Sequence, residues 1–127
     1  NIFWKKGGWL GFQYQDLECV ADFKSPKEIG YLSAEFLQDT QSWILFPQEV
    51  SYYGSNDGAN YTIIATVKST FNDKDYNIRT EEFSATLKQK VKYRYIKAKV
   101  KNYGKLPKWH EGFGDEAFIF IDELEIR

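Results

Sequence analysis

The chain is dominated by short segments in which apolar and polar residues alternate, with many β-branched and aromatic side chains. Such alternation places every second side chain on one face of a strand, and no segment shows the sustained spacing of three and four residues that predicts a helix. The segments with this pattern are 17–23, 28–37, 49–55, 61–68, 81–88, 93–101 and 117–126. The sequence therefore predicts seven strands and almost no helix.

Polar turns separate these segments, a spacing typical of antiparallel sandwiches and barrels. The clearest turn is "SNDGAN", in which Asp57-Gly58 suits a tight hairpin with positive φ. We expect an all-β fold, an antiparallel β-sandwich, and favour jelly-roll connections. The 127 residues suffice for one core and contain no repeat or linker, so residues 1–127 are expected to form a single domain.

Residues 88–108 carry nine Lys or Arg and no acid. The apolar positions change phase within this stretch, from 91 and 93 to 96, 98 and 100, which predicts a bulge or a change of facing near Arg94. We interpret the lysines as a solvated strand face that discourages edge pairing. A basic patch for nucleic acid or a sulfated glycan is the alternative.

Charge and hydropathy restrict the partners. With 17 basic and 18 acidic residues the net charge is -1, which argues against a surface shaped for nucleic acid or anionic lipid. No apolar run approaches the roughly 20 residues that cross a bilayer. We therefore expect no nucleic-acid partner and no membrane span. The single cysteine, Cys19, excludes an internal disulfide and is expected to be buried in a strand.

The titratable residues do not assemble a familiar reaction centre. One histidine, His110, is too few for a zinc site with the single distant cysteine, and no serine or cysteine stands in a G-x-S-x-G elbow. Acids near the C-terminus allow three interpretations: surface charges, a carboxylate pair for glycoside hydrolysis, or a hard-cation site with Asp122 or Glu123. Along the last segment we expect residues 119 and 121 to share one face with Glu123, opposite Asp122.

Binding without reaction fits these residues better. Exposed Trp faces stack on the apolar faces of sugar rings while neighbouring polar groups bond the hydroxyls. The four tryptophans adjoin Gly-rich or polar turns, where strand folds usually place binding sites: Trp4, Trp9, Trp43 and Trp109. For each of them, packing in the core or plugging an interface is the alternative.

Three sequence motifs occur along the chain in the order found in a known family. They contain W-x-G-F at 9–12, then P-x-x-V-x-Y and S-x-D-G within 36–58, and finally P-x-W-H-x-G-x-G followed by F-x-D-E within 107–123. In these motifs nearly the whole chain resembles the discoidin or coagulation-factor type C family, in the galactose-binding-like, carbohydrate-binding module family 32-like version attached to secreted bacterial β-hexosaminidases.

The resemblance implies an eight-stranded jelly roll with a noncatalytic carbohydrate site in loops at one end of the sandwich. The matching loop "LQDTQSW" offers Gln38, Asp39, Gln41 and Trp43 as ligand-binding residues, and "KWHEG" offers Trp109 and His110. Galactose-binding members tend to place an arginine near the middle of the chain. Positions 38–48 contain none, so galactose specificity is not implied.

Members of the family often hold a structural calcium between an N-terminal Asp-Gly loop and an acid near the last strand. Glu123 matches that acid, whereas the sequence begins too late to show the loop, which suggests either a truncated sequence or a missing first strand. No other cofactor is expected.

The resemblance implies a glycan-binding accessory domain of an exported, hence extracytoplasmic, glycoside hydrolase of the β-hexosaminidase type. The domain itself is expected not to be an enzyme. The chain is expected to be a C-terminal fragment of that larger glycoside hydrolase, and its partners would be a glycan and the catalytic domain of the same parent chain. The alternative is a structural module that packs on that catalytic domain and binds no glycan.

Overall fold

The computed structural model describes residues 2–13, 16–71 and 73–127, with side chains from residue 16 onward. Six strands and one short 3-10 turn follow each other along the chain. They are β1 (Ile2–Gln13), β2 (Leu17–Gln38), η1 (Thr40–Ser42), β3 (Glu49–Ser55), β4 (Thr62–Lys68), β5 (Arg79–Lys101) and β6 (Phe118–Ile126). This confirms the all-β prediction, and η1 is the only helical turn in the described ranges.

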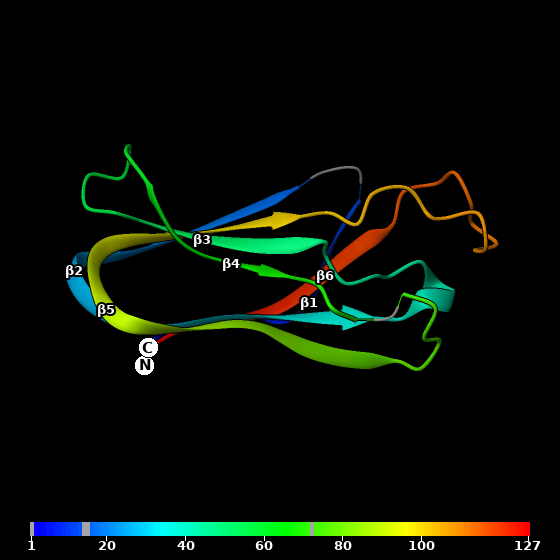
Figure 1. The fold of residues 1–127 in the computed structure, drawn as a ribbon, viewed down its shortest axis with the longest axis horizontal. Coiled ribbons are helices and arrows are strands. Elements are labelled where there is room, and N and C mark those ends of the chain that lie inside the picture. The colour runs from blue at the N-terminus through cyan, green and yellow to red at the C-terminus, as the bar shows by residue number, and fades with distance from the viewer. Residues whose placement is uncertain (1, 14–15, 72) are drawn as a thin grey trace.

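The six strands form one hydrogen-bonded antiparallel sheet in the order β1-β6-β2-β5-β3-β4, folded over into two layers (Figure 1). The N-terminal half of β2 pairs with the C-terminal half of β5, which continues to β3 and β4. The other halves of β2 and β5 pair in the second layer, and β6 and β1 extend it from β2. Each layer thus contains four strand segments.

Two of these strands were each expected as two. Segments 17–23 and 28–37 merge into β2, and segments 81–88 and 93–101 merge into β5, because both strands continue through the bend that joins the layers (Figure 1). β1 was not expected at all, and its side chains lie outside the described ones.

The bend lies opposite Arg94. The ladder between β2 and β5 skips residues between Asp22 and Lys27, which face Tyr95 and Tyr93. Lys24 adopts a left-handed φ of 68°, and its N–H donates to Oδ1 of Asp22 at 2.8 Å. The Arg94 guanidinium donates to both oxygens of the Asp22 carboxylate, at 2.9 and 3.1 Å, and this bond chiefly lowers the pKa of Asp22.

The side chains of β5 change facing at this bend, as predicted. Val91 and Tyr93 pack against the core before it, and residues 96, 98 and 100 are buried after it. Lys99 and Lys101 are exposed, which confirms the solvated face. The expectation that these lysines discourage pairing at a sheet edge was wrong, because this half of β5 lies between β2 and β3.

A similar irregularity corrects the expected facing of Glu123. The ladder passes from Glu35 opposite Glu123 to Phe36 opposite Ile121, which leaves Asp122 as one extra residue in β6. An extra residue reverses the alternation beyond it. Leu124 therefore joins Ile121 in the core, and Glu123 lies on the opposite face.

The core fills the space between the two layers. Its fully buried members include Phe36 and Phe83 from one layer and Tyr52 and Ile96 from the other. The Tyr52 hydroxyl crosses the core and donates to the carbonyl of Phe83 at 2.5 Å. Burial raises the pKa of Tyr52, so the hydroxyl keeps the proton that makes this bond. Cys19 is half-buried, and burial raises its thiol pKa.

Two smaller expectations were also tested. Gly58 has a φ of 75°, which confirms the positive φ expected there, although β3 and β4 are joined by six residues rather than by a tight hairpin. Within the described ranges, no helix is long and apolar enough to cross a membrane.

Replacing Tyr52 by Phe should lower the free energy of unfolding by about 1–3 kcal/mol, because the buried carbonyl of Phe83 loses its partner. Urea unfolding followed by fluorescence measures the change. The matched control is Tyr53→Phe on the outward face of the same strand, which should cost less than about 0.5 kcal/mol. Equal effects of the two substitutions would contradict a role for the interlayer bond.

Candidate functional site

Three loops meet at the end of the sandwich opposite the bend: residues 39–48, 69–78 and 102–117 (Figure 1). The first follows β2, the second precedes β5, and the third joins β5 to β6. The start of β1 and the end of β6, where Ile2 pairs with Ile126, lie away from this end. We call the region formed by the three loops the loop end.

The first loop turns back on itself within a few residues. The backbone N–H of Asp39 donates to the carbonyl of Ile44 at 2.8 Å, and that of Ile44 donates back at 3.0 Å. The hydroxyl of Ser42 donates to the Asp39 carboxylate at 2.9 Å. Trp43 closes the turn in the left-handed region, with φ 67°. Gln41, at the tip, is exposed.

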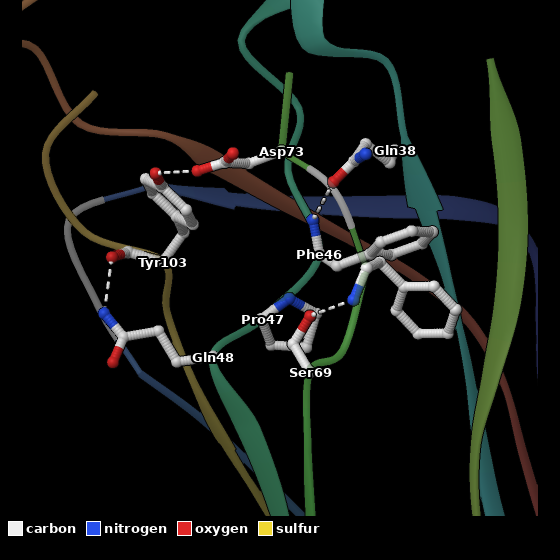
Figure 2. A pocket seen from close by; sticks show the side chains of 8 residues that line it. Gln38, Phe46, Pro47, Gln48, Ser69, Asp73 and Tyr103 are labelled. Carbon is white, nitrogen blue, oxygen red and sulfur yellow. Dashed lines mark hydrogen bonds between the residues drawn. The ribbon is translucent and has the colours of Figure 1, made fainter. Parts of the chain in front are cut away.

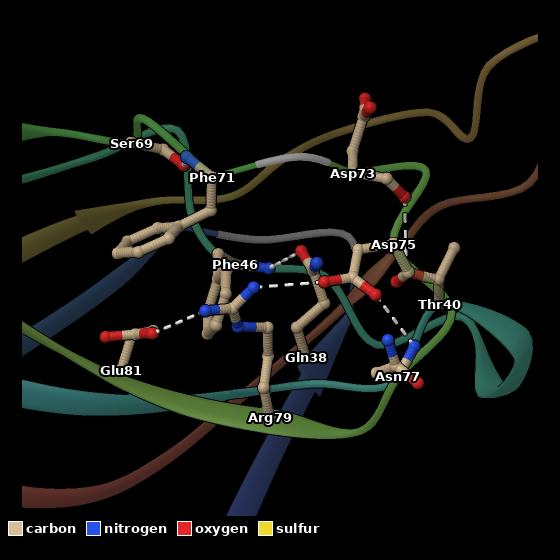
Figure 3. Close-up of polar contacts among 10 residues, drawn as sticks. All are labelled: Gln38, Thr40, Phe46, Ser69, Phe71, Asp73, Asp75, Asn77, Arg79 and Glu81. Atoms are coloured by element: carbon tan, nitrogen blue, oxygen red, sulfur yellow. Dashed lines mark hydrogen bonds and ion pairs between the residues drawn. The ribbon is translucent and has the colours of Figure 1, made fainter.

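Thr40 joins the three loops. Its hydroxyl lies 2.9 Å from the carbonyl oxygen of Asp75 and 3.2 Å from that of Asp73, both on the second loop (Figure 3). Its own carbonyl accepts a hydrogen bond of 2.6 Å from Nε2 of His110, on the third loop. Thr40 is fully buried. The three loops therefore share one buried polar anchor.

His110 is part of this anchor rather than of the surface. It is 3% exposed, and its Nδ1 accepts the backbone N–H of Gly112 at 2.9 Å. Because an amide N–H only donates, Nδ1 is the unprotonated nitrogen, and Nε2 carries the hydrogen that it donates to the carbonyl of Thr40. Both ring nitrogens are thus occupied by the protein itself, and the imidazole supports the loop.

Trp43 is a packed wedge beneath the third loop. It is half-buried against Leu106 and its neighbours Leu45 and Ala117, and its ring centroid lies 6.4 Å from that of His110. A Cβ on Gly112 would approach Trp43 Cε2 to 2.7 Å. Glycine at 112 is therefore what allows the loop to close over the indole.

A pocket of about 200 Å³ opens between the loops (Figure 2). We call it the loop-end pocket; its walls are Gln38, Phe46, Pro47, Gln48, Ser69, Phe71, Asp73 and Tyr103. The rings of Phe46, Phe71 and Tyr103 give it apolar surface. Its polar groups come from all three loops and from the end of β2.

Hydrogen bonds fix these polar walls. Gln48 Nε2 donates to the carbonyl of Tyr103 at 2.7 Å, and the Tyr103 hydroxyl donates to Oδ2 of Asp73 at 2.6 Å (Figure 2). Burial, and then the bond to Asp73, raise the pKa of Tyr103. Gln38 is 1% exposed, and its Oε1 accepts the N–H of Phe46 at 3.3 Å. It therefore lies at the back of the pocket.

An ion-pair cluster holds the second loop against β5 (Figure 3). Arg79 donates to Asp75 at 3.0 Å and to Glu81 at 2.8 Å, and its guanidinium carbon lies 5.8 Å from the centroid of the Phe71 ring. The pKa of Asp75 is lowered, first by the backbone N–H of Asn77 and then by Arg79. Arg79 is the partner of Gln38 in the ladder between β2 and β5. Residues 38–48 themselves contain no arginine.

Aromatic side chains also reach the outer surface of the loop end. The rings of Tyr76 and half-buried Trp109 meet edge to face, with centroids 6.3 Å apart, and the ammonium of Lys74 lies 5.8 Å from the Trp109 centroid. Tyr76 is 53% exposed. We call this the Tyr76–Trp109 pair.

The structure brings all six residues expected to bind the ligand to the loop end: Gln38, Asp39, Gln41, Trp43, Trp109 and His110. Of these, Gln38 and His110 are buried and supporting, whereas Gln41 and Trp109 reach the surface. Sequence reasoning missed Thr40, Asp73 and Tyr103. The polar stretch 72–77 between two strand segments was the available signal for a loop of this kind.

Glu123 lies on none of the three loops, and it faces Glu35 and Lys5 in the sheet ladders. No group of three or more His, Cys, Asp or Glu side chains among the described residues could hold a metal ion. A calcium ion held by Glu123 stays a prediction.

Known structures share this fold, whereas no protein-family model and no curated protein sequence matches the chain. CpGH89CBM32-6 from Clostridium perfringens superposes with a TM-score of 0.58 at 16% identity, covering 97% of this chain and 80% of that one. CBM32-1 from a family 31 glycoside hydrolase of Clostridium perfringens gives 0.52 at 17% identity, covering 92% and 76%. The fold is that of these CBM32 domains. The resemblance found in the sequence is confirmed at the level of fold.

Replacing Thr40 by Val keeps the shape of the side chain and removes the hydroxyl, leaving two carbonyls of the second loop without their donor. We expect a loss of about 1–3 kcal/mol in the free energy of unfolding, with the largest amide shifts in residues 69–78. Urea unfolding and NMR measure both. Thr62→Val, on the exposed face of β4, is the control; if it matches Thr40→Val, the anchor is refuted.

Proposed function

We propose that this domain binds a glycan at the loop end and catalyses no reaction. One observation carries the proposal: the loop-end pocket combines aromatic walls with fixed hydrogen-bonding groups. A sugar has apolar C–H faces and a rim of hydroxyls, so it requires both kinds of surface at once. A pocket of about 200 Å³ is of a size to hold one sugar ring rather than a long chain.

The residues divide into contacts and supports. Gln48, Ser69 and Asp73 offer polar groups to hydroxyls, and the rings of Phe71 and Tyr103 offer stacking surface. The Tyr76–Trp109 pair, with the exposed side chain of Gln41 and the carboxylate of Asp39, would contact further units of the glycan outside the pocket. The supporting residues are Gln38, Thr40, Trp43 and His110.

The setting of the domain is part of the same proposal. A family 31 glycoside hydrolase contains one of the similar domains, which supports an accessory role beside a catalytic domain. Together with the sequence resemblance, this favours an exported, extracytoplasmic parent enzyme of the β-hexosaminidase type. The termini lie away from the loop end, so a neighbouring domain attached there would leave the pocket open.

Calorimetric titration with neutral mono- and disaccharides tests the proposal. We expect binding with millimolar or tighter dissociation constants. Gln48→Ala should weaken the binding of both kinds of sugar about fivefold or more, and Trp109→Ala that of disaccharides, because each removes about one stacking or hydrogen-bonding contact worth roughly 1 kcal/mol.

Tyr61→Ala is the matched control, since this tyrosine belongs to the connection between β3 and β4, at the opposite end of the sandwich. It should leave binding unchanged. Absence of binding to every sugar by the folded wild-type domain would refute the proposal.

A structural role is the second candidate, and exposed apolar side chains favour it. Ile78 and Phe113 are 71% and 59% exposed on loops of the loop end. Such residues suit a surface that packs on a catalytic domain. Stability and sugar binding of the full-length parent, measured with and without this domain, separate the two: an interdomain module changes the stability of the parent, whereas a binding module changes its sugar affinity.

A further inference from the structure

The charge of the loop-end pocket is one-sided. Asp73 is the only carboxylate among the described residues that line it, and those residues include no lysine or arginine. The remaining polar walls are neutral amides and hydroxyls. A ligand in the pocket therefore faces one negative charge with no lining cation beside it.

The Asp73 carboxylate is held in position from two directions. The Tyr103 hydroxyl donates to its Oδ2 at 2.6 Å, and the backbone of Asp73 is fixed by Thr40, whose hydroxyl lies 3.2 Å from its carbonyl oxygen. Figure 2 shows the Asp73 carboxylate directed toward the Tyr103 hydroxyl.

Two cations close to Asp73 in sequence, Lys74 and Arg79, make contacts with residues outside the pocket lining. Arg79 is bonded to both Asp75 and Glu81, and this cluster carries a net charge of about -1 at neutral pH. The ammonium of Lys74 lies over the ring of Trp109, 5.8 Å from its centroid. Neither cation is among the described residues that line the pocket, so Asp73 is the one charged group of that lining.

From this arrangement we propose that Asp73 makes the loop-end pocket selective by charge: it admits neutral sugars, favours amino sugars with a free ammonium group, and rejects sugars that carry a carboxylate or sulfate. The inference rests on the proposed glycan binding and adds the class of sugar. A unit charge about 5 Å from Asp73 in a partly solvated site changes affinity by roughly tenfold. Anionic sugars should therefore bind about tenfold more weakly than their neutral equivalents.

Two series of monosaccharides that differ in charge test this selectivity: glucosamine, glucose and glucuronate, and galactosamine, galactose and galacturonate. Affinities are measured by NMR titration at neutral pH and low salt. For the wild-type domain we expect the order cationic, neutral, anionic in at least one series. Asp73→Asn keeps the shape of the side chain and its bond with Tyr103, and should reduce the spread to less than about threefold.

Glu111→Gln is the matched control, because Glu111 is an exposed acid on the third loop that does not line the pocket. It should leave the order unchanged. If neutral sugars bind but anionic ones bind equally well, or if Asp73→Asn leaves the order intact, charge selection is overturned and glycan binding stands. If no sugar of either series binds the folded wild-type domain, glycan binding in this pocket and the selectivity fail together.

Discussion

The ladder between β2 and β5 is the constraint on which the rest of this domain depends. Both strands run through the two layers, and they pair with each other on either side of the bend. Every other strand is attached to one of them, directly or through a neighbour. The bend consequently holds the two layers together at one end of the sandwich. The loop end lies at the other end, where the strands of both layers terminate. The Asp22–Arg94 pair and the left-handed Lys24 lie at this turning point.

The loop end is a second level of organisation, built with very little secondary structure. One buried threonine and one buried histidine connect three loops through backbone carbonyls, and the Trp43 wedge fills the space beneath them. The candidate binding groups lie around Thr40, His110 and Trp43, and most of them do not belong to this set. Gln38 and His110 illustrate this separation, because both are buried in this region and bond to the backbone of neighbouring segments.

Much of the fold could be predicted because alternation is a local property. The pattern of residues 49–55 corresponds to β3 as observed, and the phase change in 91–100 located the bend from the β5 side. What alternation does not reveal is continuity: nothing local distinguishes two strands joined by a turn from one strand that bends. The single extra residue at Asp122 was missed for the same reason, since its effect appears only in the pairing with Glu35 and Phe36.

The site was predictable as a region, whereas its chemistry depended on contacts between distant segments. Aromatic residues beside polar or Gly-containing turns pointed to Trp43 and Trp109, but the packing of Trp43 against Gly112 and Leu106 involves residues more than 60 positions away. The bonds of Tyr103 to Asp73 and of Thr40 to the second loop span more than 29 residues each. No short motif contains them.

The hydroxyl of Thr40 bonds to main-chain carbonyls, so these bonds do not involve the side chains of the residues that carry them. A substitution at position 73 can therefore alter what the pocket displays while the bond to its backbone carbonyl persists. The conformation of the loop and the ligand specificity of the pocket thus depend on different atoms. Related proteins with this scaffold could change specificity by single substitutions without changing the conformation of the loops.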